Sequence, residues 1–310
     1  MVLIDRHNTA AHGEFKYISF PRAVFFIYNE IYWNLFAKSG KIETILYTAE
    51  SKTASVVQPK RAKAMGVNVK GLILKEQNIG ENDKLVTVLT DSLGVLRAFV
   101  RGAKKLSSKK QSATGLLCYS KLSLYKTKDS YIIEEAESIE SFFGLRNDIE
   151  KLSLAQYFCD IAFELSPKED DATDFLRVVL NSLYFLANGK RSPLLLKAIT
   201  ELRLVSLAGY MPNLIACERC GAFETPIMYF DMERGLLYCD NCADENALFP
   251  LEIGVVSAMR HIVFAKIDIL YNFKLSPEAS EDLSYITEKY LASKTDRPFK
   301  TLDFYYSVKD

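Results

Sequence analysis

The sequence predicts a multidomain α+β protein, in which a small five-stranded β-barrel precedes a mostly α-helical domain with an inserted four-cysteine segment. Three observations lead to this prediction. Short segments rich in β-forming residues follow one another between residues 68 and 139. Helical periodicity replaces them after Asn147, and two Cys-x-x-Cys pairs interrupt the helical part. A chain of 310 residues is long enough for two domains.

The predicted barrel rests on five strand-like segments. They are rich in β-formers and separated by turn signals, among them Asn78-Ile79-Gly80 and Ser92-Leu93-Gly94. Five strands within about 80 residues are typical of an OB-fold, which many nucleic-acid-binding proteins use; an SH3-like barrel is the alternative. The segments are residues 69–77, 84–91, 94–103, 117–127 and 130–139.

The second half of the chain has the spacing of helices. Apolar residues recur three and four positions apart, which is the pattern of a helix with one buried face. Pro193 suits a first helical turn, and Gly209 suits the position just after a helix. The predicted helices are residues 149–165, 174–187, 193–208, 251–267 and 277–292.

Four of the six cysteines form the strongest motif. Cys217 and Cys220 make one Cys-x-x-Cys pair, and Cys239 and Cys242 make a second after 18 intervening residues. Each pair directs two thiolates at one centre, and two pairs supply the closed tetrahedral shell that Zn²⁺ accepts. Such a shell leaves no position for a substrate, so we predict one structural zinc per chain. An iron–sulfur cluster and a redox dithiol are the alternatives.

The cysteines also bear on the compartment. The chain shows no convincing secretory signal, and paired cysteines in a reducing cytosol are more often metal ligands than disulfides. Between the two pairs, residues 229–238 have the pattern of a small hairpin, with Glu233-Arg234-Gly235 at its turn.

The formal net charge is zero, but the charge is distributed unevenly. Residues 1–128 hold 21 Lys and Arg against 9 Asp and Glu, a net +12. Residues 129–310 hold 18 against 30, a net −12. A basic half is a hint of polyanion binding, and the alternative is that two soluble domains simply differ in charge.

The basic half contains a run of cations interleaved with aromatic residues. Residues 92–128 hold nine Lys and Arg and no acidic residue. On a strand, Arg97, Phe99 and Arg101 would share the face opposite the apolar residues. Phosphates pair with such cations and bases stack on such rings, whereas the alternative is an ordinary solvated surface. The candidate DNA-binding residues are Arg97, Phe99, Arg101, Lys104, Lys105, Lys109, Lys110, Lys121 and Tyr125.

Familiar enzyme motifs do not occur in the sequence. It contains no GxxxxGK[ST], HExxH, GxSxG or GxGxxG pattern. Of the three histidines, His261 lies in an apolar helical run and is expected to be packed. The acidic residues in 168–171 precede a predicted helix and should favour its N-terminus. We therefore expect no enzymatic activity.

From about Gly66 onward, the chain resembles the bacterial RecO family of DNA repair proteins. The resemblance is carried by VKGLILKEQNIGENDKLVTVLTDSLGVLRAFVRGAKK at the start and by LRLVSLAGYMPNLIACERCG leading to LYCDNCA further on. The closing DRPFKTLDFY is similar to the family's C-terminal segment. Together these segments span about four-fifths of the chain.

The resemblance implies an OB-fold at residues 65–146 and a helical domain at 147–310, with a zinc finger at about 215–245. It implies a recombination mediator that binds single- and double-stranded DNA and anneals complementary strands. The implied partners are RecR, with which it loads recombinase, and the C-terminal tail of single-stranded DNA-binding protein. The implied location is the bacterial cytoplasm, at the nucleoid. The basic barrel residues Arg97, Arg101, Lys104 and Lys105, with Lys109 and Lys110, would contact DNA.

Residues 1–64 have no counterpart in the family pattern, and Met65 resembles the natural start. We interpret them as a poorly ordered extension, consistent with an over-long gene prediction. The aromatic-rich run 20–37 is too polar for a membrane helix, so no membrane contact is expected.

Two other function classes stay open at this point. One is a zinc-ribbon adaptor between proteins, without a direct role on DNA. The other is a redox or metal-dependent enzyme that uses the thiolates, against which the closed ligand set and the missing motifs argue.

Overall fold

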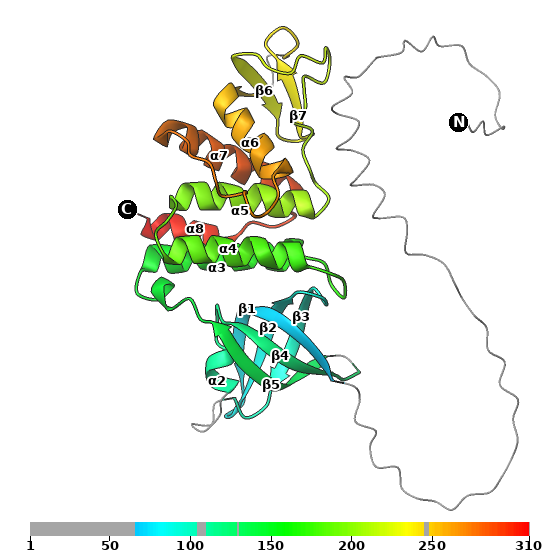
Figure 1. Cartoon of the computed structure of the whole chain (residues 1–310), viewed down its shortest axis with the longest axis vertical. Coiled ribbons are helices and arrows are strands. Elements are labelled where there is room, and N and C mark those ends of the chain that lie inside the picture. Colours follow the sequence, from blue (N-terminus) through cyan, green and yellow to red (C-terminus); the bar gives the residue numbers. More distant parts are fainter. Residues whose placement is uncertain (1–65, 104–109, 129, 245–247, 310) are drawn as a thin grey trace, which may run out of the picture. The chain divides into compact units, whose positions relative to one another are not determined.

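The computed structural model describes residues 66–103, 110–128, 130–244 and 248–309. The predicted extension, residues 1–64, therefore lies outside the described residues. Figure 1 shows the strands of the first domain and the helices that follow them.

The first domain is a closed barrel of five strands in the order β1-β2-β3-β5-β4. β3 and β5 pair in parallel, and the other neighbours are antiparallel. A short helix lies between β3 and β4, so the domain is an OB-fold, as predicted. Its elements are β1 (Val67–Ile79), β2 (Asp83–Thr90), β3 (Val95–Val100), α2 (Lys110–Ala113), β4 (Tyr119–Lys126) and β5 (Tyr131–Glu140).

The second domain contains the helices and a small three-stranded sheet in the order β7-β6-β8. The Asp148 carboxylate caps α3 by accepting from the Lys151 N–H at 3.0 Å. The helices are η1 (Phe143–Leu145, a 3-10 turn), α3 (Ile149–Leu165), α4 (Thr173–Ala187), α5 (Pro193–Leu207), α6 (Ile253–Phe264), α7 (Pro277–Lys294) and α8 (Lys300–Val308); the strands are β6 (Ile227–Asp231), β7 (Leu236–Cys239) and β8 (Phe249–Glu252).

One predicted helix is shorter than expected at both ends. The apolar spacing placed a helix near 251–267, but α6 begins at Ile253, because the residues before it form β8, and ends at Phe264. β8 pairs with β6, where Leu251 is buried opposite Met228. A strand of four residues is too short for its pattern of apolar residues to be distinguished from that of a helix in the sequence alone. The C-terminal helix α8 was not predicted at all.

The barrel joins the helices through a backbone junction. The turn between β2 and β3 lies against the loop between α3 and α4: the Val95 N–H donates to the Pro167 carbonyl at 2.9 Å, and the Glu169 N–H donates to the Leu93 carbonyl at 3.1 Å. Between them, Gly94 has a φ of 61°, and an added Cβ would lie 2.0 Å from the Pro167 oxygen. Only glycine fits there, so the predicted turn residue is also a contact residue.

Side chains extend this junction. The apolar residues Leu72, Leu74 and Leu89 of the barrel belong to the same buried core as α3 and α4. Beside them the Lys75 ammonium lies 2.6 Å from the Asp160 carboxylate, and Asp160 also accepts from the Thr301 hydroxyl at 2.8 Å. These contacts hold β1 to α3, and through Thr301 to α8.

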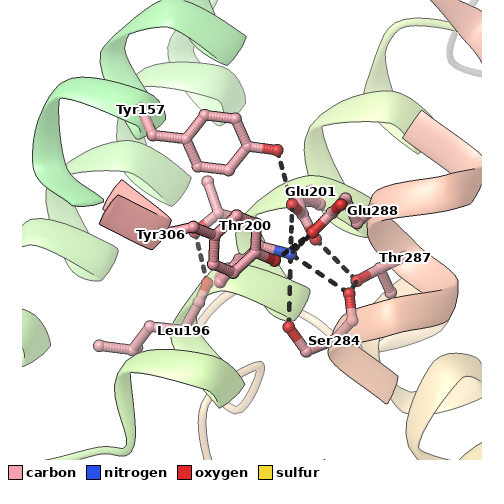
Figure 2. A network of polar contacts seen from close by, with 9 residues as sticks. Tyr157, Leu196, Thr200, Glu201, Ser284, Thr287, Glu288 and Tyr306 are labelled. Atoms are coloured by element: carbon pink, nitrogen blue, oxygen red, sulfur yellow. Dashed lines mark hydrogen bonds and ion pairs between the residues drawn. The ribbon is translucent and has the colours of Figure 1, made fainter. Parts of the chain in front are cut away.

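A buried ionic network holds the helices to one another (Figure 2). The Lys197 ammonium, with no exposed side-chain surface, lies 2.9 Å from Glu201 and 2.8 Å from Glu288. Glu201 accepts from the Tyr157 hydroxyl at 2.6 Å and from the Thr287 hydroxyl at 2.7 Å. Burial alone would lower the pKa of Lys197, but the two carboxylates outweigh it and raise that pKa, so the lysine stays charged.

We expect Lys197→Met to destabilise the helical domain by about 3–5 kcal/mol, because it leaves Glu201 and Glu288 without their counter-charge in the core. Urea denaturation measures this loss. Lys289→Met, the same change at an exposed lysine of α7, should leave the midpoint nearly unchanged. Equal midpoints for the two variants would show that the network contributes nothing to stability.

Candidate functional site

The four cysteines of the two Cys-x-x-Cys pairs come together at the small sheet. Their sulfur atoms all lie within 4.8 Å of one another, and those of Cys220 and Cys239 are 3.5 Å apart. A metal ion bound at about 2.3 Å by four thiolates would space the sulfurs about 3.8 Å apart, so the cluster fits a tetrahedral metal site. These residues could hold a metal ion, whose role there would be structural.

Backbone hydrogen bonds shape the two knuckles. The Gly221 N–H donates to the Cys217 carbonyl at 2.9 Å, and the Cys242 N–H donates to the Cys239 carbonyl at 2.9 Å. Gly221 has a φ of 75°, in the left-handed region that glycine adopts without strain. The local turns therefore form from the chain itself and direct the thiols inward.

The electrostatics of the cluster favour a bound cation. Burial opposes ionisation of Cys217, but hydrogen bonds from the backbone of Cys220, Cys239 and Arg219 lower its pKa to about 6. Hydrogen bonds to Cys220 and Cys239 raise the pKa of Cys242 to about 12. A thiolate thus forms readily at Cys217, whereas ionisation of Cys242 would be favoured by a positive charge in the cluster.

The cysteine hairpin packs into the helical core rather than standing apart from it. Met228 and Phe230 of β6 are fully buried, and the Phe230 ring centroid lies 5.5 Å from that of Tyr290 in α7. The Ser293 hydroxyl of α7 donates to the Met232 carbonyl at 3.0 Å. The predicted hairpin with its turn at Gly235 is confirmed, as β6 and β7.

The barrel carries the candidate binding face. Its inner residues Leu96 and Ala98 are buried, whereas Arg97 is exposed and Phe99 is half-buried, which confirms the predicted facing of β3. Arg101 is also exposed, in the turn that follows this strand. Strand pairing then brings residues from other strands to this face, and their positions beside one another cannot be predicted from spacing in the sequence. The register aligns Leu85 with Phe99, Phe99 with Ile132, and Ile132 with Tyr125.

These four residues form one row across β2, β3, β5 and β4, and all of them are half-buried. We call Leu85, Phe99, Ile132 and Tyr125 the barrel row. Sequence reasoning identified Phe99 and Tyr125 but missed Leu85 and Ile132. The alternation of apolar and polar residues in β5 predicts only which side of the strand Ile132 lies on. Its neighbours on other strands depend on the parallel pairing of β3 with β5.

The cations beside the barrel row differ in their partners. Lys121 pairs with Glu137 at 3.3 Å, and Lys126 pairs with Glu169 at 3.0 Å. Within the part of the chain that the structure describes, Arg97 and Arg101 have no ion-pair partner. Both guanidinium groups are therefore available to an anion that lies along the row.

The structure does not bring all the predicted residues to one place. Lys121 aligns with Lys70 of β1 and Glu137 of β5, beside a hollow that Glu134 and Glu135 also line. Lys110 is half-buried in α2 and directs its ammonium at the Ile133 carbonyl, 3.4 Å away. The described residues do not include Lys104, Lys105 and Lys109.

Comparison with known proteins decides the family. The family model described as "Recombination protein O N terminal" matches residues 65–142, and the one described as "Recombination protein O C terminal" matches residues 146–303. This chain belongs to the recombination protein O family. The predicted resemblance to RecO proteins is confirmed.

Several curated RecO proteins are similar over most of the chain. The DNA repair protein RecO of Acetivibrio thermocellus is 32% identical over 235 residues, which cover 76% of this chain and 94% of that protein. The one from Caldicellulosiruptor bescii is 30% identical, covering 78% of this chain and 99% of that protein. A RecO protein of Dehalococcoides mccartyi is 30% identical, covering 69% and 85%. The barrel and the cysteine cluster of this RecO chain both lie inside the matched domains.

We expect purified protein to contain one zinc per chain, and Cys217→Ser to lower the free energy of unfolding by more than about 3 kcal/mol. The loss should be large because Cys217 shares its core with Phe230 and the helices. Elemental analysis and thermal unfolding measure the two effects. Cys118→Ser, at a buried thiol of the barrel that donates to the Ser112 carbonyl, should keep the metal. Iron in the preparation, or unchanged unfolding after chelation, would contradict the zinc assignment.

Proposed function

We propose that this RecO family protein acts in DNA repair as a non-enzymatic recombination mediator that binds DNA through its barrel and anneals complementary strands. The observation that carries the proposal is the barrel row, with Phe99 and Tyr125 in line. Arg97 and Arg101, which have no ion-pair partner among the described residues, lie alongside. Half-buried rings offer stacking surfaces to unpaired bases, and the two cations neutralise neighbouring phosphates.

Annealing follows from charge neutralisation. Two complementary strands repel each other through their phosphates, and a cationic surface that holds them lowers this repulsion. The sequence has no phosphate-binding loop, so the proposal uses binding free energy alone and no nucleotide hydrolysis.

We assign two roles to the helical domain, which are the binding of partner proteins and a contribution to stability. Residues 129–310 carry a net −12, which suits proteins better than DNA. In this proposal the domain recruits RecR and the C-terminal tail of single-stranded DNA-binding protein, and Cys217, Cys220, Cys239 and Cys242 hold a structural zinc. Among the described helices, none is both long and apolar enough to cross a bilayer. The proposed location is the bacterial cytoplasm, at the nucleoid.

An adaptor that never touches DNA is the second candidate. Ion pairing of Lys121 and Lys126 on the barrel favours it, because these lysines are partly neutralised already. Arg97 and Arg101, with which none of the described carboxylates forms an ion pair, favour the mediator.

We expect the protein to accelerate annealing of complementary oligonucleotides without ATP, and Arg97→Gln/Arg101→Gln to slow annealing and weaken single-strand binding. The loss of two phosphate contacts should also reduce the slope of log affinity against log salt by roughly 1–2. Binding titrations at several salt concentrations and a strand-annealing assay measure these effects.

The matched control removes two cations elsewhere. Lys266→Gln/Lys274→Gln alters exposed lysines of the helical domain and should bind and anneal like the unmodified protein. Annealing no faster than in protein-free solution, or equal losses in both variants, would favour the adaptor. A requirement for ATP would refute the proposal that binding free energy suffices.

A further inference from the structure

The four clustered thiols differ in how far solvent reaches them. Cys217 and Cys239 are 3% and 2% exposed, whereas Cys220 is exposed and Cys242 is half-buried. Among cysteines of similar chemistry, exposure decides which one a small oxidant such as hydrogen peroxide meets first. Cys220 is therefore the thiol of the cluster at which oxidation would begin.

A second thiol lies in contact with Cys220. The sulfur atoms of Cys220 and Cys239 are 3.5 Å apart, and a disulfide bond joins its sulfurs at about 2.0 Å. The two atoms therefore need to approach each other by only about 1.5 Å to form a bond. An accessible thiol with a second thiol beside it is an arrangement found at redox-sensitive cysteines.

The two cysteines outside the cluster lack this arrangement. Cys118 and Cys159 are 1% and 2% exposed, and the Cys118 thiol donates to the Ser112 carbonyl at 3.0 Å. Burial raises the pKa of Cys159 to about 12, so this thiol stays protonated and unreactive. Cys118 and Cys159 therefore serve as matched controls for the cluster.

We propose that hydrogen peroxide oxidises Cys220 and Cys239 to a disulfide, so that the cysteine cluster is a peroxide-sensitive site. The inference goes beyond the proposed function and takes from it only the structural zinc. In a reducing cytosol, which is the proposed location, such a disulfide would be transient, as redox-sensing disulfides there usually are.

The reaction proceeds in two steps. The Cys220 thiolate attacks one peroxide oxygen, the O–O bond breaks, hydroxide leaves, and Cys220 becomes a sulfenic acid. The Cys239 thiolate then attacks the Cys220 sulfur, the S–S bond forms, and a second hydroxide leaves. Two electrons pass from the sulfurs to the peroxide, and both hydroxides take up protons from solvent to give water.

The disulfide changes the metal site and the hairpin together. It removes two of the four thiolates, so the closed shell that a structural zinc requires is lost and the metal is released. Cys239 is the last residue of β7 and pairs with the fully buried Met228 of β6. Because metal binding contributes to folding, its loss should lower the thermal stability of the helical domain that contains this hairpin.

The test maps the disulfide in the full, unmodified chain. Purified protein is treated with hydrogen peroxide, the remaining thiols are alkylated in denaturant, and tryptic peptides are identified by mass spectrometry. Trypsin separates the clustered cysteines into three peptides, which are residues 204–219 with Cys217, 220–234 with Cys220, and 235–260 with Cys239 and Cys242.

We expect the second and third of these peptides to be joined, with fragmentation placing the bond at Cys239. One zinc per chain should pass to a chromogenic chelator as the bond forms, and dithiothreitol should restore the thiols. Cys118→Ser/Cys159→Ser removes both cysteines outside the cluster and should release zinc with the same dependence on peroxide.

Three results would overturn the inference. They are a disulfide between any other pair of cysteines, zinc that stays bound at a peroxide concentration that fully oxidises free glutathione, and loss of zinc release in Cys118→Ser/Cys159→Ser. A preparation without zinc would contradict the structural zinc of the proposed function instead, and the mapped bond would still decide whether Cys220 and Cys239 form the peroxide-sensitive pair.

Discussion

The backbone hydrogen bonds between the β2–β3 turn and the α3–α4 loop hold the barrel against the helical domain. The Pro167 carbonyl accepts from Val95, and the close approach at Gly94 leaves no room for a side chain. Backbone contacts of this kind tolerate little displacement, because a shift leaves buried polar groups without partners. The barrel is therefore held against the α3–α4 loop at a fixed spacing.

Two polar clusters connect elements within the helical half. The buried Lys197 joins α5 to α7 through Glu201 and Glu288. The cysteine cluster closes the hairpin that packs Phe230 against Tyr290. At Lys197, removal of one partner would leave an uncompensated charge in the core, which is strongly destabilising. The basic barrel needs no such device, since its apolar interior is continuous.

Local patterns in the sequence predicted much of this fold, and long-range pairing explains what they did not predict. Alternation along β3 identified the outward face of Arg97 and Phe99, and the cysteine spacing identified the four thiols that come together. The position of Ile132 between Phe99 and Tyr125 depends on a parallel pairing between strands that are not consecutive in the chain. Lys197 likewise looks like an ordinary helical lysine until α7 brings Glu288 to it. Such contacts arise from topology, which residue spacing does not encode.

We propose above all that unpaired DNA lies along the barrel row. Ultraviolet cross-linking of a single-stranded oligonucleotide to the full chain, with the attached peptides identified by mass spectrometry, tests it most directly, because stacked rings form cross-links with the bases that they touch. The account predicts cross-links at Phe99 and Tyr125, lost in high salt. Cross-links confined to the cysteine hairpin, at Tyr229 or Tyr238, with none on the barrel would contradict it.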